Sequence, residues 1–449
     1  MLKTEALPVL SGDLVAPDHP EWDLVRRAWN LSADQRPALV ALPADAEDVV
    51  AIMDYAIRSG RKVAPQGTGH NASAIASLEG TILVSTQRMR GVELDAEAQT
   101  ARVRAGTLWL EVTEAATPHG LFPLSGSSPD VGVVGYTLGG GLSWLGRKHG
   151  LAANSVTAIE VVTPDGKLVR ATPDDHAELF WGLRGGGGNF GVVTAMEFRL
   201  YPYGEVYAGM FLWPYERHAD VLRAWRDFTR TASEDVTTSF RIMHLPPLPD
   251  LPPFLSGRSV VVVDGAFAGG VADGEQAVAP LRALEPEVDT WAASSPAVLS
   301  HIHMDPEEPI PYLSETLMTG DLDDAALEAF AAQLQPGAPV LFGELRHLGG
   351  ALAREPEGAG AIGRLDGTYV VFGVGLVMGP ETAAPVAAAL AAFTGALADY
   401  GNGAAYLNFV ERPTDTAVFF ADDAYARLRA LRAAVDPAAR MVGNHPIPA

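Results

Sequence analysis

The chain contains no cysteine among its 449 residues. Disulfide bonds, thiolate zinc sites, iron–sulfur clusters and cysteine nucleophiles are therefore excluded. The sequence also lacks any run close to the roughly 18 apolar residues that predict a membrane-spanning helix. Its first residues do not join a basic start to an apolar stretch, as a secretion signal does. From these absences we expect a cytoplasmic protein without a membrane partner.

Positive charge is scarce: 32 Lys and Arg residues face 55 Asp and Glu residues, which gives a net charge of -23. This imbalance argues against nucleic acid and anionic membranes as partners. A phosphate-bearing cofactor stays compatible, because backbone amides and helix N-termini can hold phosphate without lysine. Apolar residues make up 48% of the chain, which suffices for a large core spread over two or three domains.

The first part of the chain, residues 1–203, alternates short apolar runs, amphipathic segments and glycine turns. A strand is expected at 38–42, followed by a helix that begins after the N-cap Asp45 and ends at Gly60. Pro164-Asp165-Gly166 predicts a hairpin between strands 156–163 and 167–171.

The sequence pattern changes in residues 204–400, which combine a proline-rich loop at 245–253 with β-runs and alanine-rich helices. The β-runs are expected at 260–263 and 369–377, and the helices at 324–334 and 382–399. This mixture predicts an α+β fold with an antiparallel sheet covered by helices. Residues 401–449 form a separate tail, with a helix at 421–435.

Three glycine-rich blocks lie in the first part, at 64–72, 126–141 and 183–194. Each can bring backbone N–H groups close to oxygen atoms or to a flat ring. None has the spacing of a P-loop, and no Rossmann fingerprint follows the first strand. A dinucleotide held by glycine loops outside the Rossmann pattern points to FAD. The alternative interpretation is a turn-rich scaffold without a ligand.

Several motifs carry a resemblance to a known family, and they run in order along the chain: Gln66–Asn71, Val131–Gly141, Trp144–Leu151, Arg184–Gly191, Tyr406-Leu407-Asn408 and Asn444–Pro448. The sequence resembles the FAD-linked oxidoreductases with a vanillyl-alcohol oxidase-type flavin domain, specifically the berberine bridge enzyme-like branch. The resemblance implies a PCMH-type FAD-binding domain of two subdomains over 1–203. It implies a substrate-binding domain over 204–400 and a segment, 401–449, that returns to the FAD-binding domain.

The resemblance assigns His70 a covalent bond to the 8α-methyl group of the flavin. The alternative is non-covalent FAD with His70 as a polar wall. Some relatives add a second bond from a cysteine, and Ser128 occupies that position here. A cysteinyl link is therefore impossible, and we expect a less oxidising flavin in a less enclosed site than in doubly linked relatives.

Further cofactor-binding residues are implied by the same resemblance. Tyr136 stands where many relatives have a histidine near the flavin, and its phenol could donate a hydrogen bond there. Val131 matches a position that influences oxygen access, and its small side chain favours O2 as acceptor. The full implied set is His70 with Gln66, Gly67, Thr68, Gly69, Asn71, Ser127, Ser128, Val131, Gly132, Gly135, Tyr136, Gly139, Gly140, Gly141, Asn154, Gly188, Val193, Tyr406 and Asn408.

Tyr406 matches the tyrosine of the family's Tyr-x-Asn motif, which can act as a general base. A phenol has a pKa of about 10, so it needs a cationic neighbour to work at neutral pH. Arg346, on an expected strand at 340–348, is the candidate, and Glu344 and His347 are further pocket candidates. The alternative is a strand tyrosine packed on the flavin domain. Arg354 stands where the berberine bridge enzyme has its glutamate, which disfavours C–C bridge formation.

His301 and His303, with the acidic residues that follow them, could suggest a metal site. Pro306 and Pro309 instead favour a loop of the substrate domain, and no third ligand has a fixed spacing. We therefore expect no metal.

These observations predict an oxidase that removes a hydride from a small-molecule alcohol, sugar, phenolic or polyketide metabolite and passes electrons to O2, giving H2O2. One alternative is a dehydrogenase that uses a quinone or protein acceptor. Another is a flavin- or ligand-binding protein without turnover. The sequence does not choose the substrate, the physiological acceptor, the pathway or the oligomeric state.

Overall fold

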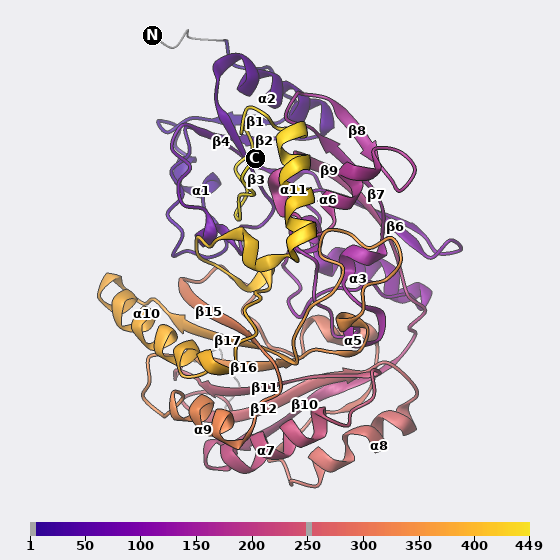
Figure 1. Ribbon diagram of the computed structural model, residues 1–449, viewed down its shortest axis with the longest axis vertical. Helices are drawn as coiled ribbons and strands as arrows, with labels where there is room; N and C mark the ends of the chain where they lie inside the picture. The colour runs from indigo at the N-terminus through magenta and orange to yellow at the C-terminus, as the bar shows by residue number, and fades with distance from the viewer. Residues whose placement is uncertain (1–5, 248–253) are drawn as a thin grey trace.

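The computed structural model describes residues 6–247 and 254–449. It contains three sheets, of four, five and eight strands (Figure 1). The beginning of the N-terminal stretch and most of the proline-rich loop at 245–253 lie outside the described residues. No helix among the residues described here is both long and apolar enough to cross a membrane.

The four-stranded sheet has the order β1-β2-β4-β3. Its strands are β1 (Asp13–Val15), β2 (Leu39–Leu42), β3 (Lys62–Gln66) and β4 (Thr81–Ser85). Helix α2 (Ala46–Ser59) begins as expected, because the Asp45 carboxylate accepts a hydrogen bond from the Asp48 N–H at 3.0 Å, and it ends at Gly60 with φ 67°. A short helix, α1 (Trp22–Val25), precedes β2. Strand β3 ends at Gln66 and so leads into the first glycine loop.

The five-stranded sheet has the order β5-β6-β9-β7-β8. Strands β7 (Val156–Val162) and β8 (Leu168–Ala171) form the expected hairpin. The remaining elements of this part are β5 (Val92–Asp95), β6 (Thr100–Arg104), β9 (Val192–Arg199), α3 (Trp109–Ala116), α4 (Val133–Leu138), α5 (Gly146–His149) and α6 (Ala177–Leu183). The second and third glycine blocks are the loops and short turns that flank α4 and follow α6.

The eight-stranded sheet is antiparallel throughout. Its main path is β13-β10-β12-β11-β16-β17-β15, and β14 pairs with β10. The strands are β10 (Val206–Pro214), β11 (Val236–His244), β12 (Ser259–Phe267), β13 (Val288–Asp289), β14 (Ala292–Ser294), β15 (Tyr312–Thr319), β16 (Phe342–His347) and β17 (Tyr369–Leu376). The antiparallel sheet expected within 204–400 is confirmed.

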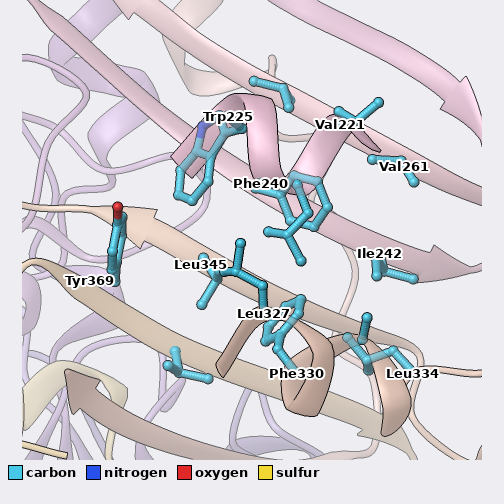
Figure 2. Packing of buried hydrophobic residues seen from close by; sticks show 14 of the residues in the cluster. Val221, Trp225, Phe240, Ile242, Val261, Leu327, Phe330, Leu334, Leu345 and Tyr369 are labelled. Carbon is cyan, nitrogen blue, oxygen red and sulfur yellow. The ribbon is translucent and has the colours of Figure 1, made fainter. Parts of the chain in front are cut away.

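Helices cover one face of this sheet and separate it from solvent (Figure 1). They are α7 (His218–Thr229), α8 (Val271–Arg282), α9 (Asp324–Ala332) and α10 (Pro380–Gly395). Trp225 of α7 and Phe330 of α9 pack in one apolar cluster with Phe240 and Leu345 of the sheet (Figure 2). This cluster is the main core of the middle part of the chain.

The opposite face of the same sheet carries charge. Successive side chains on a strand alternate between faces, so Leu345 lies in the helix-side core while Glu344 and Arg346 point the other way. The pairing register places Glu344 beside Arg241 of β11, and Ser239 beside Arg346. All four are buried. This second face lies toward the glycine loops, and it forms the floor of the site described below.

The tail contacts the first part of the chain. After helix α11 (Asp422–Val435), Val63 of β3 donates to the Arg440 carbonyl at 2.9 Å, and Val442 donates to the Val63 carbonyl at 2.8 Å. Asn189 in the third glycine block donates to the His445 carbonyl at 3.0 Å and accepts from the Ile447 N–H at 3.0 Å. These bonds attach the last residues of the tail to strand β3 and to the third glycine block.

Phe330→Ala is expected to lower the free energy of unfolding by about 3–5 kcal/mol, because it leaves a cavity in the helix-side core. Phe330 is fully buried, and its ring contacts those of Phe240 and Phe393. Urea unfolding measures the change. Phe254→Ala is the matched control, because that ring is 36% exposed and its loss should cost under about 1 kcal/mol. Equal effects of the two substitutions would contradict the packing described here.

Candidate cofactor and active site

A large cavity lies between the glycine loops and the charged face of the eight-stranded sheet. Its volume is about 370 Å³. This lies within the roughly 300–1,000 Å³ usual for small-molecule pockets. The glycine loops form one wall, and strands β15, β16 and β17 with the Tyr406–Glu411 segment form the other.

Two glycines of the loop wall are not explained by the protein's own packing. Gly67 and Gly135 line the cavity, and a Cβ added to either would meet no atom within 4 Å. Neither has a positive φ. A side chain at these positions would instead occupy cavity space, so the glycines keep that space free. This is the form expected where a flat ring or a phosphate approaches the backbone closely.

His70 lies at the tip of the first glycine loop, as expected from the sequence. Its ring stacks on Trp29, with centroids 4.4 Å apart, and its Nδ1 lies 2.7 Å from the Thr68 hydroxyl. Its Nε2 has no hydrogen-bond partner and is 3.7 Å from a carboxylate oxygen of Asp130. Burial lowers the pKa of His70 to about 4, so the imidazole is neutral at physiological pH and one of its ring nitrogens carries a lone pair.

Asp130 couples His70 to Trp29, because the Trp29 indole N–H donates to the carboxylate oxygen that faces His70. Burial raises the pKa of Asp130 to about 6. The other carboxylate oxygen of Asp130 has no hydrogen-bond partner.

Glu411 forms a second half-buried carboxyl on the cavity wall. The Tyr312 hydroxyl donates to its Oε1 at 2.9 Å, and the Asn30 amide donates to its Oε2 at 3.1 Å. The same Tyr312 hydroxyl is 3.4 Å from the His70 carbonyl oxygen. Burial raises the pKa of Glu411 to about 7. The cluster joins strand β15, the N-terminal segment and the tail beside the His70 loop.

Tyr406 is 1% exposed and lines the cavity. The Asn408 amide donates to its hydroxyl at 3.1 Å and to the Tyr136 carbonyl at 2.9 Å. A Cβ on Gly139 would lie 1.8 Å from the Asn408 side-chain oxygen, so Gly139 is required for this contact. Burial raises the pKa of Tyr406 well above its ordinary range.

Glu344 and Arg346 lie on the cavity floor, adjacent on the same face of β16. Arg346 Nε donates to Glu344 Oε1 at 2.7 Å, and its Nη2 is 3.1 Å from His303 Nε2. The Arg346 and His303 charges hold the pKa of Glu344 well below its usual range, against the opposing effect of burial. The guanidinium also lies over the rings of Phe409 and Trp144, at 5.3 and 5.6 Å.

A second layer of charge supports this floor. His303 Nδ1 is 2.8 Å from Asp264 Oδ2, and Ser239 donates to Asp264 Oδ1 at 2.5 Å. Arg241 donates to Asp264 and, at 2.9 Å, to the His303 carbonyl. Asp264 is fully buried, and each charge in this layer has an opposite partner, as burial demands.

His301 and His303 diverge. His301 is exposed and 3.6 Å from Glu307, whereas His303 is buried in the charge network. Within the residues that the structure describes, no three His, Asp or Glu side chains are grouped to hold a metal. Ser127 donates to Asp305 at 3.2 Å, and Ser128 donates to the same oxygen. The loop that carries these histidines therefore reaches across to the second glycine block.

Most of the expected site residues line this one cavity, and their individual roles stay predictions. On the catalytic side these are Tyr406, Arg346 and Glu344. On the cofactor side they are Gln66, Gly67, Thr68, Gly69, His70, Asn71, Ser127, Ser128, Val131, Gly132, Gly135, Tyr136, Gly139, Gly188, Val193 and Asn408.

Three expected cofactor residues do not line the cavity: Gly140, Gly141 and Asn154. Gly140 and Gly141 have positive φ, 108° and 81°, and shape the turn behind the wall. A Cβ on Gly141 would lie 2.5 Å from the Tyr136 ring, so its role is packing. Asn154 donates to the Gly363 carbonyl at 3.0 Å.

Three further residues named from the sequence, Tyr136, His347 and Arg354, have partners within the protein. The Tyr136 hydroxyl donates to the Leu124 carbonyl at 3.0 Å, so its hydrogen is used within the protein and not toward the cavity. His347 is buried against Arg147, 2.9 Å from Nδ1 to Nη1, and is not a pocket residue. Arg354 is exposed and paired with Glu234.

Sequence reasoning missed Trp29, Tyr312 and Glu411 at the cavity wall. Trp29 and Tyr312 lie in stretches with no motif. Glu411 lies a few residues after the Tyr-x-Asn motif. This closeness to Asn408 in the chain was the one sequence feature that could have pointed to it. None of the three shares a sequence segment with the others, so only the fold brings them together.

Gly135→Ala is expected to leave the flavin-free protein as stable as the parent or more stable by up to about 1 kcal/mol, because alanine favours helix α4. Its methyl group would enter the cavity and weaken FAD binding by about tenfold or more. Titration of flavin fluorescence in a His70→Ala background measures a reversible affinity.

Gly395→Ala is the matched control for Gly135→Ala. Gly395 also lies in a helix, with no atom within 4 Å of an added Cβ, but does not line the cavity. It should gain similar stability with unchanged FAD affinity. Equal FAD affinity in the two variants would show that Gly135 does not border the cofactor.

Glu411→Gln is expected to flatten the pH dependence of stability. The carboxyl has a pKa of about 7 when folded and 4.5 ordinarily, so the folded protein binds the extra proton across this window. Its contribution is therefore present below pH 4.5 and is lost as the pH rises through 7. The loss is at most about 3 kcal/mol.

Urea unfolding of the parent and of Glu411→Gln between pH 4.5 and 8 measures that contribution. The raised pKa of Asp130, about 6, also makes the free energy of unfolding fall as the pH rises. The lowered pKa of His70, about 4, makes it rise with pH. Both groups are common to the two proteins, so the difference isolates Glu411. Parallel stability profiles would contradict the raised pKa of Glu411.

Comparison with known proteins agrees with the expected family. Residues 37–172 match the family model of an FAD binding domain. The (R)-6-hydroxynicotine oxidase of Paenarthrobacter nicotinovorans is 32% identical over 205 residues, which cover 45% of this chain and 45% of that protein. The chain thus spans about half the length of the curated relatives it matches.

Solved structures extend the likeness of fold to nearly the whole chain. The 6-hydroxy-D-nicotine oxidase of Arthrobacter nicotinovorans has a TM-score of 0.86 at 24% identity, covering 97% of both chains. BBE-like 1 of Physcomitrella patens has a TM-score of 0.84 at 19% identity, covering 98% of this chain and 97% of that one. The chain therefore carries an FAD-binding domain on the fold of the PCMH-type, berberine bridge enzyme-like FAD oxidoreductases.

Proposed function

We propose that the protein is an FAD-dependent oxidase whose cofactor is bonded covalently to His70 through the flavin 8α-methyl group. Its substrate is a small-molecule alcohol, sugar or phenolic metabolite, and O2 is the electron acceptor, giving H2O2. The observation that carries the proposal is the state of His70: a neutral imidazole at the tip of a glycine loop, on the wall of a cavity that all three glycine blocks line.

His70 is prepared for such a bond by its neighbours. Stacking on Trp29 and contact with Thr68 fix the ring orientation. Burial keeps the ring uncharged at neutral pH, so a nitrogen lone pair is available. When bound, FAD would supply a two-electron acceptor for the hydride of the substrate.

The floor residues would position the substrate and manage its proton. At neutral pH Glu344 is ionised, whereas Tyr406 is a protonated phenol whose oxygen already accepts a bond from Asn408. The general-base role of Tyr406 requires loss of a proton that burial opposes. In the resting protein Tyr406 therefore serves as a hydrogen-bonding group of the floor.

Oxygen as the acceptor is supported by the small side chain of Val131, which lines the cavity. The similarity to an enzyme named an oxidase supports the same choice. A dehydrogenase is the second candidate, and slow reoxidation by O2 after anaerobic reduction would favour it.

Acid precipitation of the purified protein is the decisive test of the covalent bond. The yellow colour is expected to stay with the pellet of the parent protein and to move to the supernatant, or to be absent, in His70→Ala. His119→Ala is the matched control, because that histidine is exposed and does not line the cavity.

Each remaining outcome of the acid test has a definite meaning. Colour in the supernatant of the parent would exclude the covalent bond and leave a non-covalent flavoprotein. A colourless protein that stays colourless after incubation with FAD would overturn the proposed function as a whole.

A further inference from the structure

His303 is buried on the cavity floor, with one ring nitrogen toward each of two charged pairs. Its Nδ1 lies 2.8 Å from Asp264 Oδ2, and its Nε2 lies 3.1 Å from Arg346 Nη2. A guanidinium group can only donate hydrogen bonds, so Nε2 must accept through its lone pair. The structure therefore describes a neutral imidazole, whose one N–H hydrogen is on Nδ1 and points to Asp264.

Glu344 faces the same nitrogen with an oxygen that lacks a donor. Its Oε1 accepts from Arg346 Nε at 2.7 Å, whereas its Oε2 has no hydrogen-bond partner among the described residues. This oxygen is closed to solvent, so a molecule in the cavity cannot reach it and the missing donor has to come from the protein. His303 Nε2 lies 3.7 Å away and would become that donor by taking up a proton.

Charge balance favours that proton. The ring of His303 faces three carboxylates and two guanidinium groups, which are Asp264, Glu344, Asp305, Arg241 and Arg346. A neutral His303 leaves one negative charge in excess, and a protonated His303 cancels it. Burial and the Arg241 charge lower the pKa of His303, but the carboxylates outweigh them, and the pKa lies above its ordinary value. The hydrogen bonds thus show the neutral form, whereas the charges favour the protonated form, and the two forms compete near neutral pH.

Protonation would change the partner of Nε2 and leave the other contacts in place. Two donors repel each other, so a hydrogen on Nε2 breaks the contact with Arg346 Nη2 and is drawn to Glu344 Oε2 instead. The Nδ1 bond to Asp264 persists, because that nitrogen carries a hydrogen in both forms. Arg346 keeps its Nε bond to Glu344 Oε1, while its Nη2 loses its acceptor beside the cavity that the side chain lines.

We propose that His303 is a proton-controlled positioning residue. In its neutral form it holds Arg346 Nη2, and in its protonated form it turns to Glu344 Oε2 and leaves Arg346 Nη2 free for an acceptor atom of a molecule in the cavity. Because coupling between two binding events is reciprocal, such an acceptor and the proton favour each other. The proposal goes beyond the oxidase function and does not depend on which substrate or cofactor is bound.

Nitrogen NMR of the full-length protein, with labelled histidine, tests where the proton is. The signals of His303 are identified as those that His303→Gln lacks. At pH values above its titration we expect a hydrogen on Nδ1 and a lone pair on Nε2. Below its titration we expect a hydrogen on both nitrogens.

Removing a carboxylate should displace this titration. Glu344→Gln is expected to lower the midpoint by about 1–3 pH units, because it removes both a negative charge and the acceptor of the protonated form. Asp305→Asn, outside the sheet, should lower the midpoint in the same direction. Glu307→Gln is the matched control on the same loop, because Glu307 is exposed and lies 3.6 Å from the exposed His301. It should leave the midpoint nearly unchanged, since solvent and salt screen its charge.

Crystal structures at pH values on either side of the midpoint test the change of partner. The distance from His303 Nε2 to Glu344 Oε2 is expected to fall from 3.7 Å to roughly 2.7–3.2 Å at the lower pH. The distance from Nε2 to Arg346 Nη2 should increase from 3.1 Å to more than about 3.5 Å.

A hydrogen on Nε2 at every pH would overturn the proposal, as would a ring that stays neutral wherever the protein is folded. Equal distances in the two crystal structures, or a midpoint that moves in neither Glu344→Gln nor Asp305→Asn, would also contradict it. Each readout can be taken with or without bound flavin. Failure of this inference therefore leaves the proposed function standing, and a protein that takes up no FAD leaves this inference standing.

Discussion

Mutual neutralisation of buried charges governs the floor of the cavity. One face of the eight-stranded sheet is apolar and packs against the helices. Because side chains alternate between the two faces of a strand, the other face carries the residues of the cavity floor. On that face Asp264 must be paired with Arg241, and Glu344 with Arg346, because an unpaired buried charge costs several kcal/mol, on the order of 3–5. His303 joins the two pairs. The position of each floor group therefore depends on all the others.

Glycines in the cavity wall fall into two physical kinds. Gly139 and Gly69 are required by the protein itself, since added Cβ atoms would lie 1.8 Å from Asn408 and 2.9 Å from Ala28. Gly67 and Gly135 have no such neighbour. No packing contact of the protein requires a glycine at these two positions. We therefore interpret them as keeping space free for a ligand, and the first two as forming tight contacts within the protein.

Local patterns in the sequence predicted the local features well. The Asp45 cap, the Gly60 terminus and the glycine loop that carries His70 all depend on residues close together in the chain. The antiparallel sheet within 204–400 followed from its β-runs. By contrast, Trp29 beside His70 and His303 beside Glu344 could not be predicted, because they come from distant segments of the chain.

Backbone geometry and hydrogen bonds show how residues of the glycine-rich motifs lie relative to the cavity. Gly140 and Gly141 belong to a glycine-rich motif, but their positive φ values serve the turn and not the cavity. Tyr136 does line the cavity, yet its hydroxyl donates its hydrogen to the carbonyl oxygen of Leu124. A sequence motif indicates which segments lie near the cavity. The hydrogen bonds within the protein then decide which of their atoms are free to contact a ligand.

The bond between Asn30 and Glu411 joins residues 381 positions apart. The pairing of Val63 with Met441 is of similar span. Closing such long loops costs chain entropy before any contact repays it, which slows folding. The wall beside His70 is therefore completed late, after the tail has been synthesised. During translation this wall lacks the contribution of residues 401–449 until they have emerged, so the complete cavity exists only after that point.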